Sequence, residues 1–323
     1  MSALWSFLPV NPATGSDAPV KLIPLPGESV LTVTGPDSEK FLQGQTTTDF
    51  RDVNASTARP GCLCNLKGRA TVSYRALFWR DSYQLVTDGA LLDSLHATLK
   101  KYIIFSKAQL ATPDTAVFGI VGQGADAWVA QHFGSLPDGE GQVWGDDKTA
   151  IVRLPGAGRY LVLADAGILS ELWAKLSADA AVGDINDWRL AQIRAGECQV
   201  LAGAAELFQP QELNLQVHQG ISYNKGCYTG QEIVARLYFR GKLKQWAHRF
   251  SVDSMLPPAI GSAICNEKGQ TAGHVILAAR ADSHRFELLA VARHDDLSGL
   301  HPADQPAAAL TVLDLPYAIE PRE

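Results

Sequence analysis

The chain has 323 residues, of which 46% are hydrophobic and 19% charged, and its formal net charge is −6. This length predicts two or three domains, and the composition is that of an ordinary globular protein. The net charge argues against a dedicated nucleic-acid-binding protein, which usually contains a basic domain.

The expected location is the cytoplasm. Five cysteines, an odd number in a long chain, do not suggest a disulfide framework, so a reducing compartment is favoured. Residues 1–15 contain no basic residue and therefore differ from a secretory signal or a transit peptide. The sequence also has no run of eighteen apolar residues, so no membrane span is predicted.

After a loose lead-in of about 19 residues, strands and helices alternate. Runs of β-branched and aromatic residues predict strands, and apolar residues at helical spacing predict helices. The predicted strands are Ser29–Thr34, Thr71–Trp79, Ser82–Thr87 and Tyr102–Leu110, and the predicted helices contain Phe41–Leu42 and Leu91–Leu99.

This first part of the chain recurs. The pattern of Val30–Gly35 returns at Val117–Gly122, and that of Tyr83–Asp88 returns at Tyr160–Asp165. A helix pattern follows each of them, at Ala125–Trp128 and at Ile168–Leu176 in the second copy. Each copy reads strand, helix, strands, helix, strand, which predicts a split βαβ (ferredoxin-like) unit. The alternative is that the two segments share only the alternation of strands and helices that any α+β chain shows.

The last third has a different texture. Asn186–Gly196 predicts a helix with a glycine stop, and Cys198–Gly220 is polar and irregular. Short strands are then predicted at Ala247–Val252, Gly261–Cys265, Thr271–Leu277 and Phe286–Ala292, with a hairpin turn at Glu267–Gly269. We therefore predict an α+β fold with two ferredoxin-like mixed domains, residues 1–112 and 113–243, and a small C-terminal β-barrel, residues 244–323.

Residues 224–236 combine two glycines, a cysteine and a lysine with the start of an apolar segment. Thr229 and Glu232 have the spacing of a capping box, which predicts a helix from Gly230. The positive end of that helix and Lys225 would lower the pKa of the Cys227 thiol. The alternative is a small buried cysteine without a chemical role.

Residues 225–249 carry a local charge of about +5, leaving about −11 for the rest of the chain. Tyr238, Phe239 and Trp246 interleave with the cations. This pattern is found in proteins that bind RNA or single-stranded nucleic acid, and it also suits a flat aromatic ligand with an anionic tail. A solvated edge strand defended by cations is the structural alternative.

The remaining cysteines do not predict a metal site. Cys62 and Cys64 are separated by one residue, whereas zinc and iron–sulfur sites usually have two or more between ligands. Cys198 and Cys265 show no ligand spacing either, so we expect no resident metal. The sequence motifs of serine hydrolases, phosphate-binding loops and zinc proteases are also absent.

The segment around Cys227 resembles the signature of the YgfZ family of folate-binding proteins, which are relatives of the aminomethyltransferase (T-protein) of glycine cleavage. These proteins are linked to assembly and repair of iron–sulfur clusters. The residues that carry the resemblance are Lys225, Gly226, Cys227, Tyr228, Gly230, Gln231, Glu232 and Arg236, with further similarity at Phe41–Asp49, Lys67–Arg69, Trp188–Gly196 and Gln211–Gly226.

The resemblance implies a T-protein-like ring of domains around a central channel for tetrahydrofolate or a one-carbon derivative. It implies Cys227 as a functional thiolate with Lys225 as its stabilising partner. Gly226, Tyr228, Gly230, Gln231 and Arg236 would shape the loop or contact the ligand, and Glu232 would be mostly structural. The implied folate contacts are Gln45, Arg69, Trp188, Arg194 and Asn214.

The chain departs from the T-protein where that protein handles protons. Positions near Thr71–Ser73 hold no carboxylate, and a pterin-reading glutamate falls at Arg194. Whether the chain is an enzyme is left open, and we expect no turnover of its own.

The implied function is a tetrahydrofolate-binding accessory protein for iron–sulfur enzymes, including tRNA-modifying ones. Expected partners are folate and these client enzymes, with no membrane and no stable nucleic-acid complex. The alternatives are a folate-dependent aminomethyl- or methyltransferase and an RNA-binding module.

Overall fold

The computed structural model describes residues 3–8 and 18–319. Most of the predicted lead-in, together with the last four residues, lies outside these ranges. The chain divides into two compact units. Unit 1 comprises residues 1–41, 50–59 and 75–191, and unit 2 comprises residues 42–49, 60–74 and 192–323.

The first sheet contains the strands predicted in the first hundred residues. Its spatial order is β3 (Arg59–Cys64), β4 (Ala70–Trp79), β5 (Ser82–Asp88), β2 (Glu28–Thr34) and β6 (Gln109–Ala111). The pairs β2–β5, β2–β6 and β4–β5 are antiparallel. Helices α1 (Ser38–Gln43) and α2 (Leu92–Tyr102) confirm the two predicted helices. The order β6-β2-β5-β4 agrees with the expected split βαβ unit.

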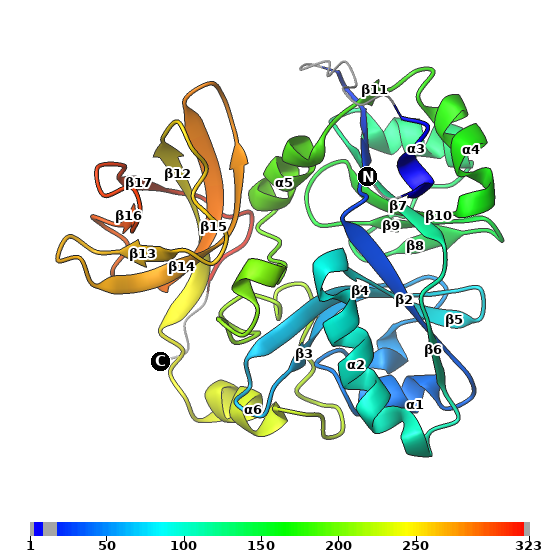
Figure 1. Cartoon of the computed structure of the whole chain (residues 1–323), viewed down its shortest axis with the longest axis horizontal. Helices are drawn as coiled ribbons and strands as arrows, with labels where there is room; N and C mark the ends of the chain where they lie inside the picture. Colours follow the sequence, from blue (N-terminus) through cyan, green and yellow to red (C-terminus); the bar gives the residue numbers. More distant parts are fainter. Residues whose placement is uncertain (1–2, 9–17, 320–323) are drawn as a thin grey trace. The chain divides into compact units, whose positions relative to one another are not determined.

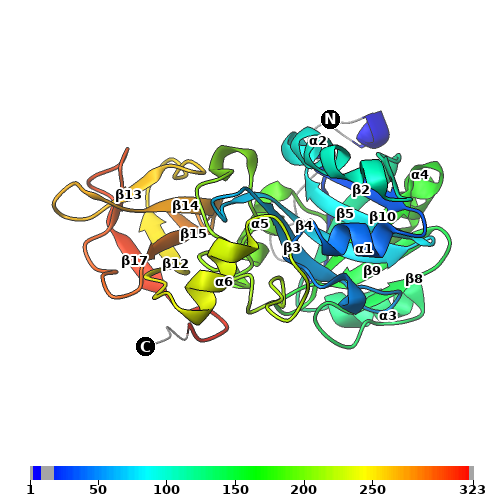
Figure 2. The ribbon, with the colours of Figure 1, turned by 90° about the horizontal axis from the view of Figure 1, so that it is seen from below.

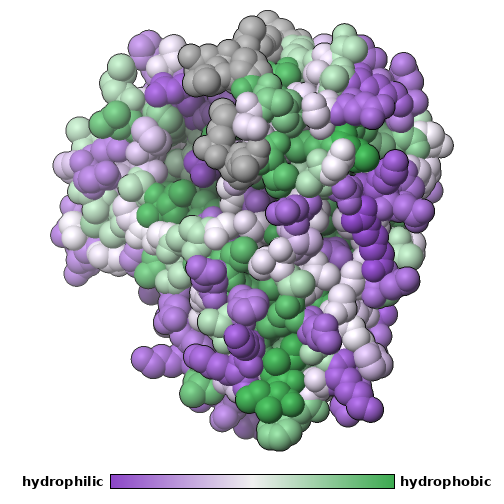
Figure 3. Space-filling model, turned by 45° about the vertical axis from the view of Figure 1, so that its right-hand side comes forward, coloured by the Kyte–Doolittle hydropathy of each residue, from purple (hydrophilic) through white to green (hydrophobic). Residues whose placement is uncertain are grey.

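The prediction of a strand over Tyr102–Leu110 was wrong for most of its length. Helix α2 continues to Tyr102, a 3₁₀ turn follows at Ile103–Phe105, and strand β6 starts only at Gln109. The apolar run looked like a buried strand, but Ile104 is 74% and Phe105 98% exposed. In Figure 1, α2 runs toward the lower end of the drawing. Figure 3, a view turned by 45°, shows a compact hydrophobic group at the lower end of the face that it draws.

The second sheet belongs to unit 1. Its spatial order is β11 (Ala181–Val182), β1 (Lys21–Pro24), β7 (Thr115–Val121), β10 (Arg159–Asp165), β9 (Thr149–Arg153) and β8 (Val143–Gly145). Helices α3 (Ala125–Phe133) and α4 (Leu169–Leu176) follow β7 and β10 as predicted. Strand β1 was not predicted; it pairs with β7 and separates it from β11.

The repeat extends to local geometry. The Asp88 side chain accepts a hydrogen bond from Ala90 N (3.1 Å), and the Asp165 side chain accepts one from Gly167 N (2.8 Å). Each aspartate caps a 3₁₀ turn that leads directly into a helix, α2 or α4. The same residue type therefore performs the same capping role at equivalent positions of the two copies.

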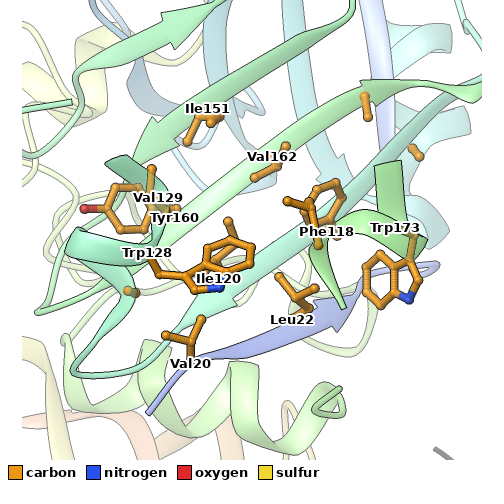
Figure 4. Packing of buried hydrophobic residues seen from close by; sticks show 14 of the residues in the cluster. Val20, Leu22, Phe118, Ile120, Trp128, Val129, Ile151, Tyr160, Val162 and Trp173 are labelled. Atoms are coloured by element: carbon orange, nitrogen blue, oxygen red, sulfur yellow. The ribbon is translucent and has the colours of Figure 1, made fainter. Parts of the chain in front are cut away.

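The core of unit 1 lies on both faces of the second sheet. On one face, shown in Figure 4, Phe118 packs edge-on against Trp173 with ring centroids 5.6 Å apart. Trp188 belongs to the buried cluster on the other face. Aromatic rings and aliphatic side chains from strands and helices thus fill the space between the layers, which is the main stabilising term in such a fold.

Unit 2 contains a curled antiparallel sheet (Figures 1 and 2). Its spatial order is β16 (His301–Pro302), β13 (Ala263–Cys265), β14 (Thr271–Arg280), β15 (Arg285–Arg293), β12 (Gln245–Asp253) and β17 (Leu310–Leu313). The four predicted strands and the turn that ends at Gly269 are confirmed. A backbone hydrogen bond from Leu310 N to Leu300 O (2.8 Å) joins its two edges.

Two helices flank a long irregular stretch. Helix α5 (Ile185–Arg194) matches the predicted helix, and Gly196 after its end has a positive φ of 65°. Helix α6 is Gln231–Phe239. The residues between α5 and α6 are all described, and their one helical element is a 3₁₀ turn at Ala202–Ala204. This part of the chain is therefore irregular, as predicted.

Candidate functional site

The loop that carries Cys227 lies in unit 2, between the irregular stretch and α6. Cys227 is exposed, whereas Cys62, Cys64 and Cys198 are buried and Cys265 is half-buried. The neighbouring Gly226 has open space where a Cβ would be. The Cys227 thiol is therefore accessible from solvent, and the alternative of a buried cysteine is wrong.

The predicted capping box is wrong, although the helix begins where expected. The N-cap residue of α6 is Gly230, with φ 83°, and no side chain caps the helix. A Cβ on Gly230 would lie 2.5 Å from Asn65 O and 2.9 Å from Cys64 Cβ. The absence of a side chain thus lets the helix start lie directly against the turn between β3 and β4, in a backbone conformation that glycine adopts readily.

Lys225 anchors the loop to a distant segment of the chain. Its side chain is buried, with 8% of the residue exposed, and its Nζ donates to Thr46 O (2.7 Å) and Thr48 O (2.5 Å). The ammonium also lies 5.2 Å from the centroid of the Tyr228 ring. Burying a charge is costly unless it is hydrogen-bonded, so the hydrogen bonds to these carbonyls offset part of the cost of burying the ammonium.

A group of thiols and phenols lies near Tyr228. The Cys62 and Cys64 Sγ atoms are 3.8 Å apart. The hydrogen bond between them and their burial raise the pKa of the Cys64 thiol, and burial likewise raises the pKa of Tyr228, with the two cysteines adding to it. The Tyr228 hydroxyl has no hydrogen-bond partner among the described residues. The Cys64 thiol and the Tyr228 phenol are therefore neutral at ordinary pH.

Two of the predicted folate contacts are arginines that form ion pairs within unit 2. Arg69 Nη1 lies 3.2 Å from Glu212 Oε2 and donates to Leu207 O (2.6 Å). Arg194 Nη2 lies 2.9 Å from Glu287 Oε1. Burial raises the pKa of Glu287, but the hydrogen bonds from Arg194 and Arg249 outweigh burial and hold this pKa below its usual range.

The other predicted folate contacts are in different surroundings. Trp188, in unit 1, packs against Gly119, where any Cβ would overlap the indole ring. The guanidinium carbon of Arg159 lies 5.0 Å from the centroid of that ring. Gln45 is half-buried in unit 2, next to Thr46. The structure therefore brings Gln45 near the backbone anchor of Lys225, and it accounts for Trp188 as part of a core.

Asn214 lines a pocket of about 420 Å³ in unit 2. The pocket is formed by residues between 211 and 223, the end of α6, residues between 241 and 246, and residues 318–319. Tyr223 and Tyr238 line it as a stacked pair with ring centroids 3.6 Å apart. Its volume is within the range of small-molecule sites.

The basic stretch of residues 225–249 is not an edge strand, so that alternative is wrong. Residues 231–239 are helical, and β12 lies between β15 and β17 inside its sheet. Arg240, Lys242 and Lys244 are exposed. These cations alternate along the chain with Gly241 and Leu243, which line the pocket.

Two negative results concern the described residues alone. Residues 3–8 and 18–319 hold no group of three His, Cys, Asp or Glu side chains arranged to bind a metal ion. Within the same ranges, no helix combines the length and the apolar character needed to cross a membrane.

Comparison with known proteins identifies the family. No protein-family model matches the chain. The tRNA-modifying protein YgfZ of Cronobacter sakazakii (strain ATCC BAA-894) is 33% identical over 327 residues, which cover 98% of this chain and 99% of that protein. The tRNA-modifying protein YgfZ of Serratia proteamaculans (strain 568) is 34% identical, with 97% of each chain covered. The chain belongs to the YgfZ family. The resemblance seen around Cys227 is thus confirmed over nearly the full length.

The fold is similar to that of a solved structure outside the YgfZ family. Aminomethyltransferase T of the glycine cleavage system from Bartonella henselae matches with a TM-score of 0.76 at 15% identity, covering 93% of this chain and 87% of that one. At this identity the match shows the fold alone. The chain therefore has a mixed α+β, aminomethyltransferase-like fold.

Sequence reasoning missed most of the pocket. Tyr238 and Trp246 were noticed because aromatic residues interleave with cations, and Asn214 because of the family resemblance. Gln211 and Gln216 lie in the segment Gln211–Gly226 that resembles the family, but the sequence did not single them out as pocket residues. Their contribution appears only once the chain brings residues 211–223 to the end of α6.

Proposed function

We propose that this chain is a tetrahydrofolate-binding accessory protein that supports assembly or repair of iron–sulfur enzymes, including tRNA-modifying ones. Cys227 would be its functional thiolate. Membership of the YgfZ family supports this proposal, as does the name tRNA-modifying protein that its relatives carry. The observation that carries it is an accessible Cys227 on a loop that the buried Lys225 fixes to the backbone at Thr46 and Thr48.

The proposed ligand is tetrahydrofolate or a one-carbon derivative. We assign its contacts to Gln45, Arg69, Trp188, Arg194 and Asn214, in a channel at the centre of a T-protein-like ring. The ring would consist of two mixed α+β domains, residues 1–112 and 113–243, and a β-barrel domain, residues 244–323. Arg69 and Arg194 would supply the positive charge that the glutamate tail of a folate requires.

The chain is proposed to act without turnover of its own. Proton transfer in folate chemistry needs a positioned acid or base. The hydroxyl of Thr71 donates to Leu63 O, and that of Ser73 accepts from Val200 N, so these side chains serve the fold. Arg194 is a cation bound to Glu287. An accessory role in the cytoplasm, with folate and client enzymes as partners and no stable nucleic-acid complex, follows from this proposal.

Cys227→Ser tests the thiol in a cell that lacks its own copy of this protein. We expect the variant to lose support of iron–sulfur enzymes, measured as the level of a tRNA modification that such an enzyme makes. The matched control is Cys265→Ser, which removes a half-buried thiol from β13 and should retain support. Full support by Cys227→Ser would overturn the role of the thiol.

Titration calorimetry of the same purified proteins tests the ligand. Tetrahydrofolate should bind wild type and Cys227→Ser with nearly equal affinity, because the thiol would take part in chemistry rather than in binding. Absence of binding to both proteins would overturn the folate part of the proposal. Multiple turnovers with a methylamine-type donor would instead support an aminomethyltransferase.

A further inference from the structure

Three large apolar side chains at the end of α2 are left in solvent. Tyr102 is 49%, Ile104 74% and Phe105 98% exposed. Together these three side chains, which follow one another within four residues, form the apolar knob. Single exposed apolar residues are common on protein surfaces, but a group of them marks a site of interaction. The apolar knob is therefore a surface that a partner can cover.

Backbone contacts hold the apolar knob in place. Lys107 N donates to Asp37 Oδ2 (2.7 Å), and Asp37 N donates back to Lys107 O (3.3 Å). Ser106 N closes the 3₁₀ turn by donating to Ile103 O (2.8 Å). Gly35, with φ 104°, has no side chain, and a Cβ there would overlap Lys107 O. The segment after α2 is thus fixed against the turn between β2 and α1, so a partner would bind it at a small ordering cost.

Cations flank the apolar knob along the chain. Lys100, Lys101 and Lys107 are exposed. Residues 94–113 contain these three lysines and no acidic residue, so their formal charge is +3 in a chain whose total is −6. The Asp37 carboxylate at the base of the segment accepts from the backbone of Lys107. A complementary surface would therefore place carboxylates opposite the three ammonium groups.

These features fit a protein partner better than a membrane or a nucleic acid. Segments that bind an anionic bilayer usually carry roughly four to eight lysines or arginines, and this chain has three here and a negative total charge. A nucleic acid binds to aromatic rings and to many cations, whereas Ile104 has no ring on which a base could stack. A rigid aromatic side chain that protrudes, as Phe105 does, is the usual anchor of a protein interface.

We propose that the apolar knob docks into an apolar pocket of another protein, with carboxylates at the rim of that pocket opposite Lys100, Lys101 and Lys107. Phe105 is the central anchor of this contact. Because three side chains bury a small area, the complex is transient and its Kd lies in the micromolar range. The surface consists of residues of unit 1 and includes none of the loop around Cys227, so this inference does not rest on the proposed function.

Photo-crosslinking in living cells finds the partner. The probe is p-benzoylphenylalanine at position 105 of the full chain, where it keeps an aromatic anchor. We expect an adduct with one protein, and the yield should fall roughly tenfold when Lys100→Glu and Lys101→Glu are combined with the probe. The same probe at Met255 is the matched control, because Met255 is 70% exposed and residues 250–267 contain no Lys or Arg. The absence of an adduct at position 105, or the same adduct at both positions, would overturn the proposal.

Capture alone does not decide, so the captured protein is purified and titrated with the full chain by calorimetry. We expect saturable binding that weakens as salt is raised from about 50 mM to about 500 mM, because the lysines and carboxylates are screened. Phe105→Ser removes the anchor and should weaken binding roughly thirtyfold. Met255→Ser removes an equally exposed apolar side chain elsewhere and should bind normally. Equal affinity of Phe105→Ser and wild type would overturn the proposal.

Three other occupants are tested with the same variants. Cosedimentation with vesicles of phosphatidylethanolamine and phosphatidylglycerol tests a membrane, filter binding of total bacterial tRNA tests a nucleic acid, and sedimentation velocity tests a second copy of this chain. Any of these associations that Phe105→Ser abolishes and Met255→Ser retains would assign the apolar knob to that occupant and overturn the protein partner. Identical behaviour of Phe105→Ser and wild type in all three, together with the loss of the protein complex, supports the proposal.

Discussion

The ammonium of Lys225 donates a 2.5 Å hydrogen bond to the backbone carbonyl of Thr48, 177 residues earlier in the chain. A second bond, to Thr46 O, makes the contact a two-point anchor. The sequence placed Lys225 beside Cys227 and predicted an electrostatic partner for the thiol. The structure adds a mechanical role, because this buried lysine fixes the position of the loop that presents the thiol.

Lys225→Met should destabilise the protein and loosen the loop. The substitution leaves the carbonyls of Thr46 and Thr48 without this donor, at a cost of about 1–3 kcal/mol. Urea unfolding measures the stability, and hydrogen exchange of residues 224–230 measures the loop. Lys242→Met is the control, because Lys242 is exposed and a surface change of this kind usually stays within about 0.5 kcal/mol. Unchanged exchange in Lys225→Met would contradict the anchoring role.

Gly230→Ala should be destabilising for two separate reasons. The residue has a φ of 83°, and a Cβ would press on Asn65 O and Cys64 Cβ. Strain of this kind costs about 1–3 kcal/mol. Gly226→Ala is the matched control from the same loop, since no atom lies within 4 Å of the position of its Cβ. Thermal unfolding of both variants measures the difference, and equal melting temperatures would contradict the predicted close contact.

Local patterns predicted most elements of this fold, and contacts between distant segments account for the errors. Alternation and helical spacing placed β2, β5, α2 and four strands of the C-terminal sheet, β12 to β15, but not its short strands β16 and β17. Strand β1 was not predicted because its four residues, Lys21–Pro24, show no periodicity. Their extended conformation depends on pairing with β7. The family resemblance identified the loop around Cys227.

The sequence located the loop around Cys227, but it did not predict the contacts that hold this loop. Thr229 and Glu232 have capping-box spacing, yet Gly230 starts α6 because Cys64 and Asn65 leave no room for a side chain there. Likewise, nothing in the sequence near Lys225 indicates that its partners are Thr46 and Thr48. Such contacts require the three-dimensional path of the chain.

When the native protein is treated with a thiol reagent, one cysteine, Cys227, should react fast. Cys227 is exposed, whereas burial raises the pKa of Cys198 and, together with the hydrogen bond to Cys62, that of Cys64. Because the thiolate is the reactive form, the buried cysteines should react only on unfolding. The kinetics of a chromogenic disulfide reagent measure this. The fast phase should vanish in Cys227→Ser and persist in Cys265→Ser; a fast phase that survives in Cys227→Ser would contradict the assignment.

The stability of the protein should fall between about pH 6.5 and pH 4 partly because of His248. Burial, with a smaller contribution from His294, lowers the pKa of His248 to about 4. The imidazole rings of the two residues are stacked with centroids 5.3 Å apart. In this window the unfolded chain binds a proton that the folded chain does not, so stability rises with pH and is lost as pH falls.

His248→Phe should remove this contribution, because phenylalanine does not titrate and the buried Nε2 of His248 has no partner among the described residues. The full window corresponds to about 3 kcal/mol at most. Urea unfolding at pH 7, 5.5 and 4.5 measures it for wild type and variant. The difference in unfolding free energy between the two proteins should shift in favour of His248→Phe as pH falls. A difference that stays constant over this range would show that His248 binds its proton equally well in the folded and unfolded states.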